Sequence, residues 1–110
     1  MRLLHKPLYW LSASLTTPPL SAIARVEAGY LLRLLQAGEK LSLPHSRPMP
    51  SIGKRCHELR ITDSDKIWRI FYRTDEDAIV IPHWVVKKTN KTSKKDIDLC
   101  ISRLKEYDSV

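Results

Sequence analysis

The spacing of the apolar residues changes twice along this chain, and these changes limit the folds that it can adopt. From Leu20 to Leu35 the apolar residues recur every three or four positions, as on one face of a helix. Between Cys56 and Val86 they alternate with polar residues or form short β-branched and aromatic runs, as in strands. Helical spacing returns from Ile97 to Leu104. This order predicts an α+β fold in which helices pack against a small antiparallel sheet.

Local signals predict where the helices begin and end. Thr17-Pro18-Pro19 is typical of a helix start, because a hydroxyl can cap the helix and proline needs no N–H donor in the first turn. Gly38 is typical of a helix end, and Thr92-Ser93 followed by Asp96 predicts the capped start of a second helix. The apolar stripe of the first helix is predicted to comprise Leu20, Ile23, Ala24, Tyr30, Leu31, Leu34 and Leu35.

Three strands are predicted over residues 56–61, 67–72 and 78–86, joined by acidic turns into an antiparallel meander. Pro82 implies that the third of these strands lies at an edge of the sheet or contains a bulge. The segment from Leu3 to Leu15 could supply a further strand, and the proline-rich residues 40–53 are predicted to be irregular. A chain of 110 residues fits one domain, which we place over residues 1–110.

The charge of the chain narrows the class of partner. Nineteen lysines and arginines against 12 acids give a net charge of +7, which favours nucleic acid, an anionic membrane surface or an acidic protein segment. No apolar stretch is long enough to span a membrane, and His5, Lys6 and Pro7 interrupt any signal peptide. Cys56 and Cys100 lie far apart and outside any C-x-x-C arrangement. One structural disulfide is an alternative, but we expect two reduced thiols and a cytoplasmic protein.

Basic residues concentrate on the predicted strands and before the last helix, where a sheet would gather them into one positive surface. Such a surface binds phosphates, although a lysine run can also be simply a solvated segment. Arg60 and Arg69 lie on neighbouring predicted strands and belong to this surface. The other residues predicted to bind RNA phosphates are Lys54, Arg55, Arg73, Lys87, Lys88, Lys91 and Lys94.

Histidines supply the candidates for proton transfer. His57 and His83 lie on predicted strands, and imidazole titrates near neutral pH, although a lone strand histidine is more often structural. The alternation of residues 56–61 places His57, Leu59 and Ile61 on the face opposite to Cys56, Glu58 and Arg60. No metal-ligand motif, glycine-rich phosphate loop or Gly-x-Ser-x-Gly motif is present, so we expect chemistry without a metal or another cofactor. RNA is a suitable substrate for chemistry without a metal or cofactor, since its 2′-hydroxyl is an internal nucleophile.

Several short motifs occur in the order found in one known group of proteins. They are Lys6-Pro7-Leu8-Tyr9-Trp10, residues 47–53, Glu58-Leu59-Arg60-Ile61, Trp68-Arg69-Ile70-Phe71-Tyr72, His83 and residues 87–92. Together they resemble the phage-derived HigB-like branch of the RelE/ParE toxin superfamily, from about Lys6 to Tyr107.

The resemblance implies a RelE-like fold, cleavage of mRNA on the translating ribosome, and neutralisation by a cognate antitoxin, often a helix-turn-helix protein of the HigA kind. By position, Arg60 and Arg69 match basic residues around the scissile phosphate, and Lys87 with Lys88 matches the basic pair after the last strand. His83 matches a histidine that commonly precedes this pair, whereas His57 has no secure counterpart. Val85 and Val86 depart from the aromatic residue and glutamine that are usual in this branch.

Two other functions remain open on the same fold. A ParE-like protein would inhibit DNA gyrase without catalysis, and fold alone does not decide between these activities. A degenerate relative would bind RNA or its partner without activity, and the aromatic residue missing at Val85 leaves this alternative open.

Overall fold

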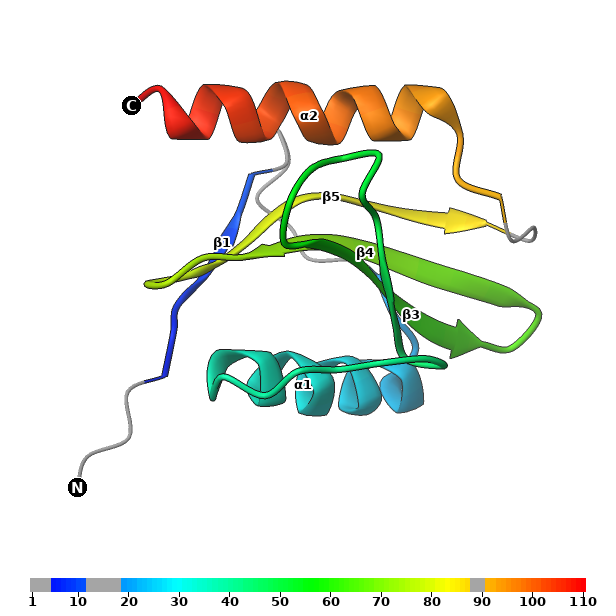
Figure 1. The fold of residues 1–110 in the computed structure, drawn as a ribbon. Helices are drawn as coiled ribbons and strands as arrows, with labels where there is room; N and C mark the ends of the chain where they lie inside the picture. Colours follow the sequence, from blue (N-terminus) through cyan, green and yellow to red (C-terminus); the bar gives the residue numbers. More distant parts are fainter. Residues whose placement is uncertain (1–4, 12–18, 88–90) are drawn as a thin grey trace.

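The computed structural model describes residues 5–11, 19–87 and 91–110. Its strands form one five-stranded sheet in the order β1-β5-β4-β3-β2. Helix α1 covers one face of this sheet and helix α2 covers the other (Figure 1). The predicted α+β class is therefore confirmed. The elements are, in chain order, β1 (Leu8–Trp10), α1 (Ala22–Gln36), β2 (Ser46–Pro48), β3 (Cys56–Asp63), β4 (Lys66–Thr74), β5 (Ile79–Lys87) and α2 (Lys94–Asp108).

The predicted antiparallel meander is confirmed for β3, β4 and β5, whereas β1 makes the sheet as a whole mixed. Strand β1 runs parallel to β5, with Tyr9 opposite Val80. This pairing joins residues about seventy positions apart, and no local pattern reveals the direction of such a pair. Strand β2 was also missed, because it has three residues, ends at Pro48 and lies within the segment predicted to be irregular.

Helix α1 begins later than the proline motif predicts. Ser21 is its N-cap, and the Ser21 hydroxyl accepts a hydrogen bond from the Ala24 N–H at 3.2 Å. Thr17 and Pro18 lie outside the described residues. The predicted end is confirmed, because Gly38 has φ +90° and closes the helix. The start of α2 is also confirmed, with Ser93 as the N-cap that accepts from the Asp96 N–H at 3.1 Å.

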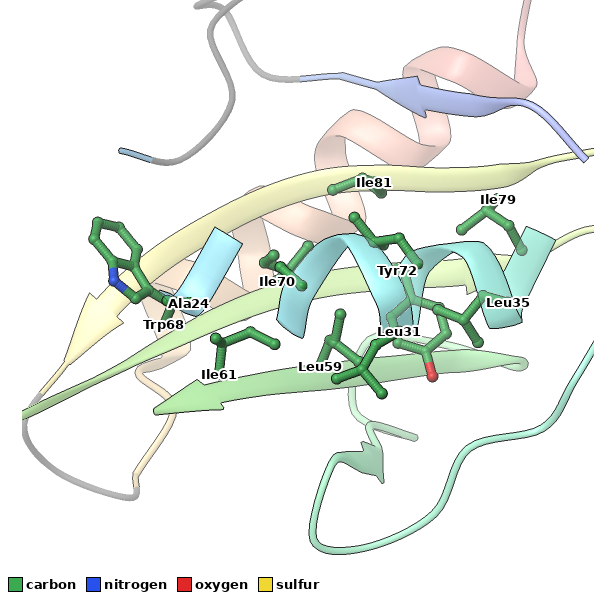
Figure 2. Close-up of a cluster of buried hydrophobic side chains, with 12 residues drawn as sticks. Ala24, Leu31, Leu35, Leu59, Ile61, Trp68, Ile70, Tyr72, Ile79 and Ile81 are labelled. Carbon is green, nitrogen blue, oxygen red and sulfur yellow. The ribbon is translucent and has the colours of Figure 1, made fainter. Parts of the chain in front are cut away.

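The larger part of the core lies between the sheet and α1 (Figure 2). Ala24, Leu31 and Leu35 of the helix pack there against strand residues such as Leu59 and Ile70. The predicted stripe is wrong for Ile23 and Tyr30, which are 86% and 58% exposed. The buried face follows positions 24, 28, 31 and 35, so residues one step earlier are rotated toward solvent.

A smaller cluster lies between the sheet and α2. Phe71 and Val80 of the sheet pack with Cys100 and Leu104 of the helix. Cys56 belongs to the same cluster, and both cysteines are free and buried. The two clusters make the sheet the middle layer of three, as the ribbon shows (Figure 1).

Pro82 lies at a bulge in β5, which is one of the two positions that the sequence predicts for it. Phe71 of β4 pairs with His83, whereas Arg73 pairs with Val80, so β5 contains one extra residue in this interval. Proline is tolerated there because a bulged residue donates no ladder hydrogen bond. After the bulge, His83 lies beside Phe71 on the face of the sheet that α2 covers.

Candidate functional site

The alternation of β3 separates the candidate residues onto two faces of the sheet, as predicted. Glu58 lies on the α2 side, whereas Leu59 lies in the core beneath α1. The register places Glu58 of β3 opposite Arg47 of β2, and Arg60 opposite Arg69 of β4. Three arginines from three strands therefore converge on one buried carboxylate.

The geometry of this group is close. Glu58 and Arg69 are both fully buried, and Nη1 of Arg69 lies 3.2 Å from Oε2 of Glu58. The second carboxylate oxygen lies 3.2 Å from Nη2 of Arg47 and 3.7 Å from Nε of Arg60. The Thr92 hydroxyl, which precedes α2, donates to Oε2 of Glu58 at 3.0 Å. We call Arg47, Arg60 and Arg69 around Glu58 the arginine cluster.

The arginine cluster carries an excess of positive charge, and part of it is open to solvent. Its three guanidinium groups face one carboxylate, which leaves a net positive charge near the surface. The side chains of Arg47 and Arg60 are 36% and 22% exposed, whereas that of Arg69 has no exposed area. An anion that approaches from solvent would therefore meet Arg47 and Arg60.

A second polar group lies where β5 meets α2. Nε2 of His83 is 3.0 Å from Oδ1 of Asp96, and the imidazole stacks on Phe71 with the rings 6° from parallel. Oδ2 of Asp96 accepts from Nζ of Lys87 at 2.9 Å and from the Ser93 hydroxyl at 2.7 Å. Burial opposes the ionisation of Asp96, but these hydrogen bonds outweigh it and lower its pKa to about 2. Asp96 is thus an anion at neutral pH and fixes the orientation of the imidazole.

The arginine cluster and the His83–Asp96 pair lie side by side. Thr92 contacts the cluster and the next residue, Ser93, contacts Asp96. Across the sheet, Arg69 pairs with Val85, which follows His83 by two positions on the same strand. Cations that can hold a phosphate and an oriented imidazole that can move a proton therefore share one face, at the N-terminal end of α2.

His57 is not part of this arrangement. It lies on the α1 side, where its ring is 5.2 Å from the ring of Tyr72 and 15° from parallel with it. Its Nδ1 is 3.2 Å from the carbonyl oxygen of Arg55. The sheet separates His57 from the arginine cluster, so of the two histidines proposed for proton transfer the structure brings only His83 to the arginines.

The predicted phosphate-binding residues divide between the two ends of α2. Near its N-terminal end, Lys87 binds Asp96, Lys94 pairs with Asp98 at 2.8 Å, and Lys91 is exposed. Lys88 lies outside the described residues.

The other three predicted phosphate-binding residues line a pocket of about 350 Å³ near the C-terminal end of α2. Lys54 and Arg55 are exposed there, with Arg73 more deeply placed. The Arg73 guanidinium donates to both carboxylate oxygens of Asp108 and of Asp75, and these bonds raise its pKa above the ordinary value. Arg73 thus ties the end of β4 to α2, while its predicted contact with phosphate stays a prediction.

Sequence reasoning did not single out Arg47, Glu58, Thr92 or Asp96 as site residues. Glu58 carried the one usable signal, since the alternation places this acid on the face of Arg60. Asp96 was interpreted as the acid in the first turn of the last helix, which it is, and its bond to His83 depends on how α2 packs on β5. Arg47 lies in the strand that the sequence did not reveal.

In residues 5–11, 19–87 and 91–110, no group of three or more histidine, cysteine or acidic side chains could hold a metal ion. Neither helix that the structure describes is long and apolar enough to cross a membrane. The expectation of metal-independent chemistry stays a prediction.

Comparison with known proteins assigns the chain to a family. Residues 19–105 match the family model described as phage-derived protein Gp49-like (DUF891). No curated protein and no solved structure matches the chain. The matched span covers most of the chain and includes the arginine cluster and the His83–Asp96 pair. The chain therefore belongs to the phage-derived Gp49-like family.

Proposed function

We propose that this protein is the toxin of a type II toxin–antitoxin system, of the RelE/HigB kind, and that it cleaves mRNA on the ribosome. The observation that carries this proposal is the placement of the arginine cluster beside the His83–Asp96 pair on one face of the sheet. The Gp49-like family is associated with RelE-like toxins, which supports the same function.

In this proposal Arg47 and Arg60 hold the scissile phosphate, since their guanidinium groups are partly exposed. They stabilise the negative charge that grows on the phosphate oxygens in the transition state. Arg69 was expected to contact the phosphate directly. Because Arg69 is fully buried against Glu58, we assign it a positioning role, in which it and Glu58 fix the arrangement of the two exposed arginines.

The reaction needs two proton movements. The 2′-oxygen attacks phosphorus in line, the bond from phosphorus to the 5′-oxygen breaks, and a 2′,3′-cyclic phosphate and a 5′-hydroxyl form. One proton leaves the 2′-hydroxyl and one arrives on the 5′-oxygen. Asp96 engages Nε2 of His83, so Nδ1 is the atom that carries one of these protons. No step in this sequence uses a metal or a cofactor.

The partners follow from the same proposal. The translating ribosome would present the mRNA, and the net charge of +7 suits binding to its RNA in the cytoplasm. A cognate antitoxin, which we expect to be a helix-turn-helix protein of the HigA kind, would neutralise the toxin. The proposal involves no membrane.

Transcript ends mapped in a reconstituted translation reaction test this function. The wild-type protein should produce new ends within translated regions, with 2′,3′-cyclic phosphates, only while ribosomes translate. His83→Gln should lower the cleavage rate by about 10²- to 10⁴-fold, the usual contribution of a general acid or base. Arg60→Met should lower it by about 10²-fold or more. Arg25→Met is the matched control, because it removes one exposed cation from α1 on the other side of the sheet.

Induction of the protein in growing bacteria, with the same mapping of transcript ends, separates the alternatives. Full cleavage by both His83→Gln and Arg60→Met would contradict the assigned site. Growth arrest with DNA damage and intact transcripts would indicate a ParE-like inhibitor of gyrase. Neither arrest nor cleavage would indicate a relative that binds RNA or its partner without activity.

A further inference from the structure

A pocket of about 430 Å³ lies on the side of the sheet opposite to the arginine cluster, where the C-terminal end of α1 meets β3 and β4. Its volume falls within the range of about 300–1,000 Å³ that is usual for pockets of small ligands. The proposed cleavage mechanism does not use this pocket. His57, which the sequence marks as a candidate and the structure separates from the arginines, lies in its wall.

The interior of the pocket is apolar and aromatic. Leu35 and Tyr72 are fully buried and form its floor, and both belong to the core seen in Figure 2. The Tyr72 hydroxyl shares a 2.6 Å hydrogen bond with the Ser46 hydroxyl, which fixes the phenol ring. His57 lies nearly parallel to this ring and is only half-buried, so the imidazole adds an accessible aromatic surface to the wall.

Charged side chains surround the mouth. Lys40 and Arg55 line the pocket and are exposed, so their cationic groups lie between its interior and solvent. Arg55 has a left-handed backbone with φ +62°, which is unfavourable for a residue with a side chain. Its Nε donates to the Thr74 carbonyl at 3.0 Å and its Nη2 lies 3.5 Å from Oδ1 of Asp75, so the guanidinium is held where it lines both this pocket and the pocket near α2. Glu39 is the acid at the same mouth.

We propose that this pocket binds one unstacked base of single-stranded RNA, with the neighbouring phosphates beside Lys40 and Arg55. Proteins bind such bases by stacking them on histidine, tyrosine or other planar side chains and by placing cations along the backbone. The aliphatic floor, the imidazole wall and the two cations match these requirements. The Glu39 carboxylate repels phosphate but can accept a hydrogen bond from an exocyclic amino group. The base therefore lies on the Glu39 side of the pocket, and the phosphates lie on the side of Lys40 and Arg55.

This inference rests on the proposed function for its choice of RNA as the ligand. The base bound at His57 belongs to a nucleotide other than the scissile one, because the sheet separates the two sites. The pocket therefore contributes to affinity and position and not to the chemical step. His57 acts through its ring and not through its proton, so substitutions there should change KM and leave kcat unchanged.

A binding experiment without cleavage tests the proposal. The probe is a fluorescein-labelled single-stranded heptanucleotide with 2′-O-methyl groups, which removes the internal nucleophile, and fluorescence anisotropy gives its Kd. His57→Ala should raise the Kd about tenfold or more, the loss expected for one base stacked on an aromatic ring. His57→Phe keeps a planar ring without a titratable nitrogen and should stay within about threefold of wild type. His5→Ala is the control, because His5 is an exposed histidine outside the pocket.

Each outcome decides the proposal. Circular dichroism first establishes that the variants fold. Equal losses for His57→Phe and His57→Ala would show that the ring nitrogen is required and would overturn the stacking role. Unchanged binding in all variants would also overturn it, as would a loss of antitoxin binding with RNA binding intact. If wild type binds the probe in the predicted way but cleaves no mRNA, the proposed function fails and this site stands. If it cleaves normally and His57→Ala binds like wild type, only the site fails.

Discussion

The buried carboxylate of Glu58 provides the sharpest test of how this fold is held together. Replacing Glu58 with glutamine keeps the size of the side chain and removes the negative charge that faces Arg69. Both groups are fully buried, and their atoms are 3.2 Å apart. The buried Arg69 guanidinium then lacks this counter-charge, while Arg47 and Arg60 stay close and repel it.

The expected loss of stability depends on which partner is removed. Without Glu58 the three arginines lose their carboxylate, whereas without Arg69 the carboxylate keeps two arginines. Removing one partner of a buried ion pair usually costs about 3–5 kcal/mol, against a total stability of about 5–15 kcal/mol for a domain. Arg69→Met should cost less, about 1–2 kcal/mol, because Glu58 still faces two other arginines. With Arg69 already replaced, Glu58→Gln should add little. The coupling between the two sites should then be about 2 kcal/mol or more.

Urea unfolding at pH 7 measures these energies, with circular dichroism and tryptophan fluorescence as two probes of one transition. With a slope of about 1.5 kcal/mol per molar urea, Glu58→Gln should lower the midpoint by about 2–3 M. Asp98→Asn is the matched control, since it breaks the exposed pair with Lys94 and should cost less than about 0.5 kcal/mol. The reasoning is refuted if Glu58→Gln costs no more than this control. The reasoning is also refuted if Glu58→Gln lowers stability by the same amount in the wild-type protein and in the Arg69→Met variant.

Three further predictions concern other parts of the fold. Asp96→Asn should remove up to about 2 kcal/mol of stability at neutral pH. The folded-state pKa of about 2 lies below the ordinary 3.8, so this stabilisation exists above about pH 4 and is lost toward pH 2, where the urea midpoints of the two proteins should converge. Burial raises the pKa of the Cys100 thiol to about 12, so mass spectrometry should find it modified by a thiol reagent only as fast as the protein unfolds, and rapid native labelling would contradict its burial. Ile23→Gln should change stability by less than about 0.5 kcal/mol, because Ile23 is 86% exposed, whereas Leu31→Ala at 3% exposure should cost about 2–5 kcal/mol; similar losses in calorimetry would show that the buried face of α1 is misassigned.

Local sequence determined much of the secondary structure. The alternation from Cys56 to Ile61 gave the right faces for β3, because side chains on a strand point to opposite sides with a fixed period. Gly38 and Ser93 marked helix ends correctly, since capping depends on the backbone and side chains of a few adjacent residues. Pro82 indicated an irregular position for a similar reason, because a missing N–H is a local property.

Tertiary structure decided the rest. The parallel pairing of β1, the strand that carries Arg47, and the solvent-facing position of Ile23 all depend on contacts between distant segments. The candidate site depends on them most. Sequence identified Arg60, Arg69 and His83 separately, but only packing shows that Glu58 buries Arg69, that α2 brings Asp96 to His83, and that the sheet places His57 on the other side. Local pattern fixes which way each side chain points along its own element, whereas burial and charge pairing arise only when elements far apart in sequence meet.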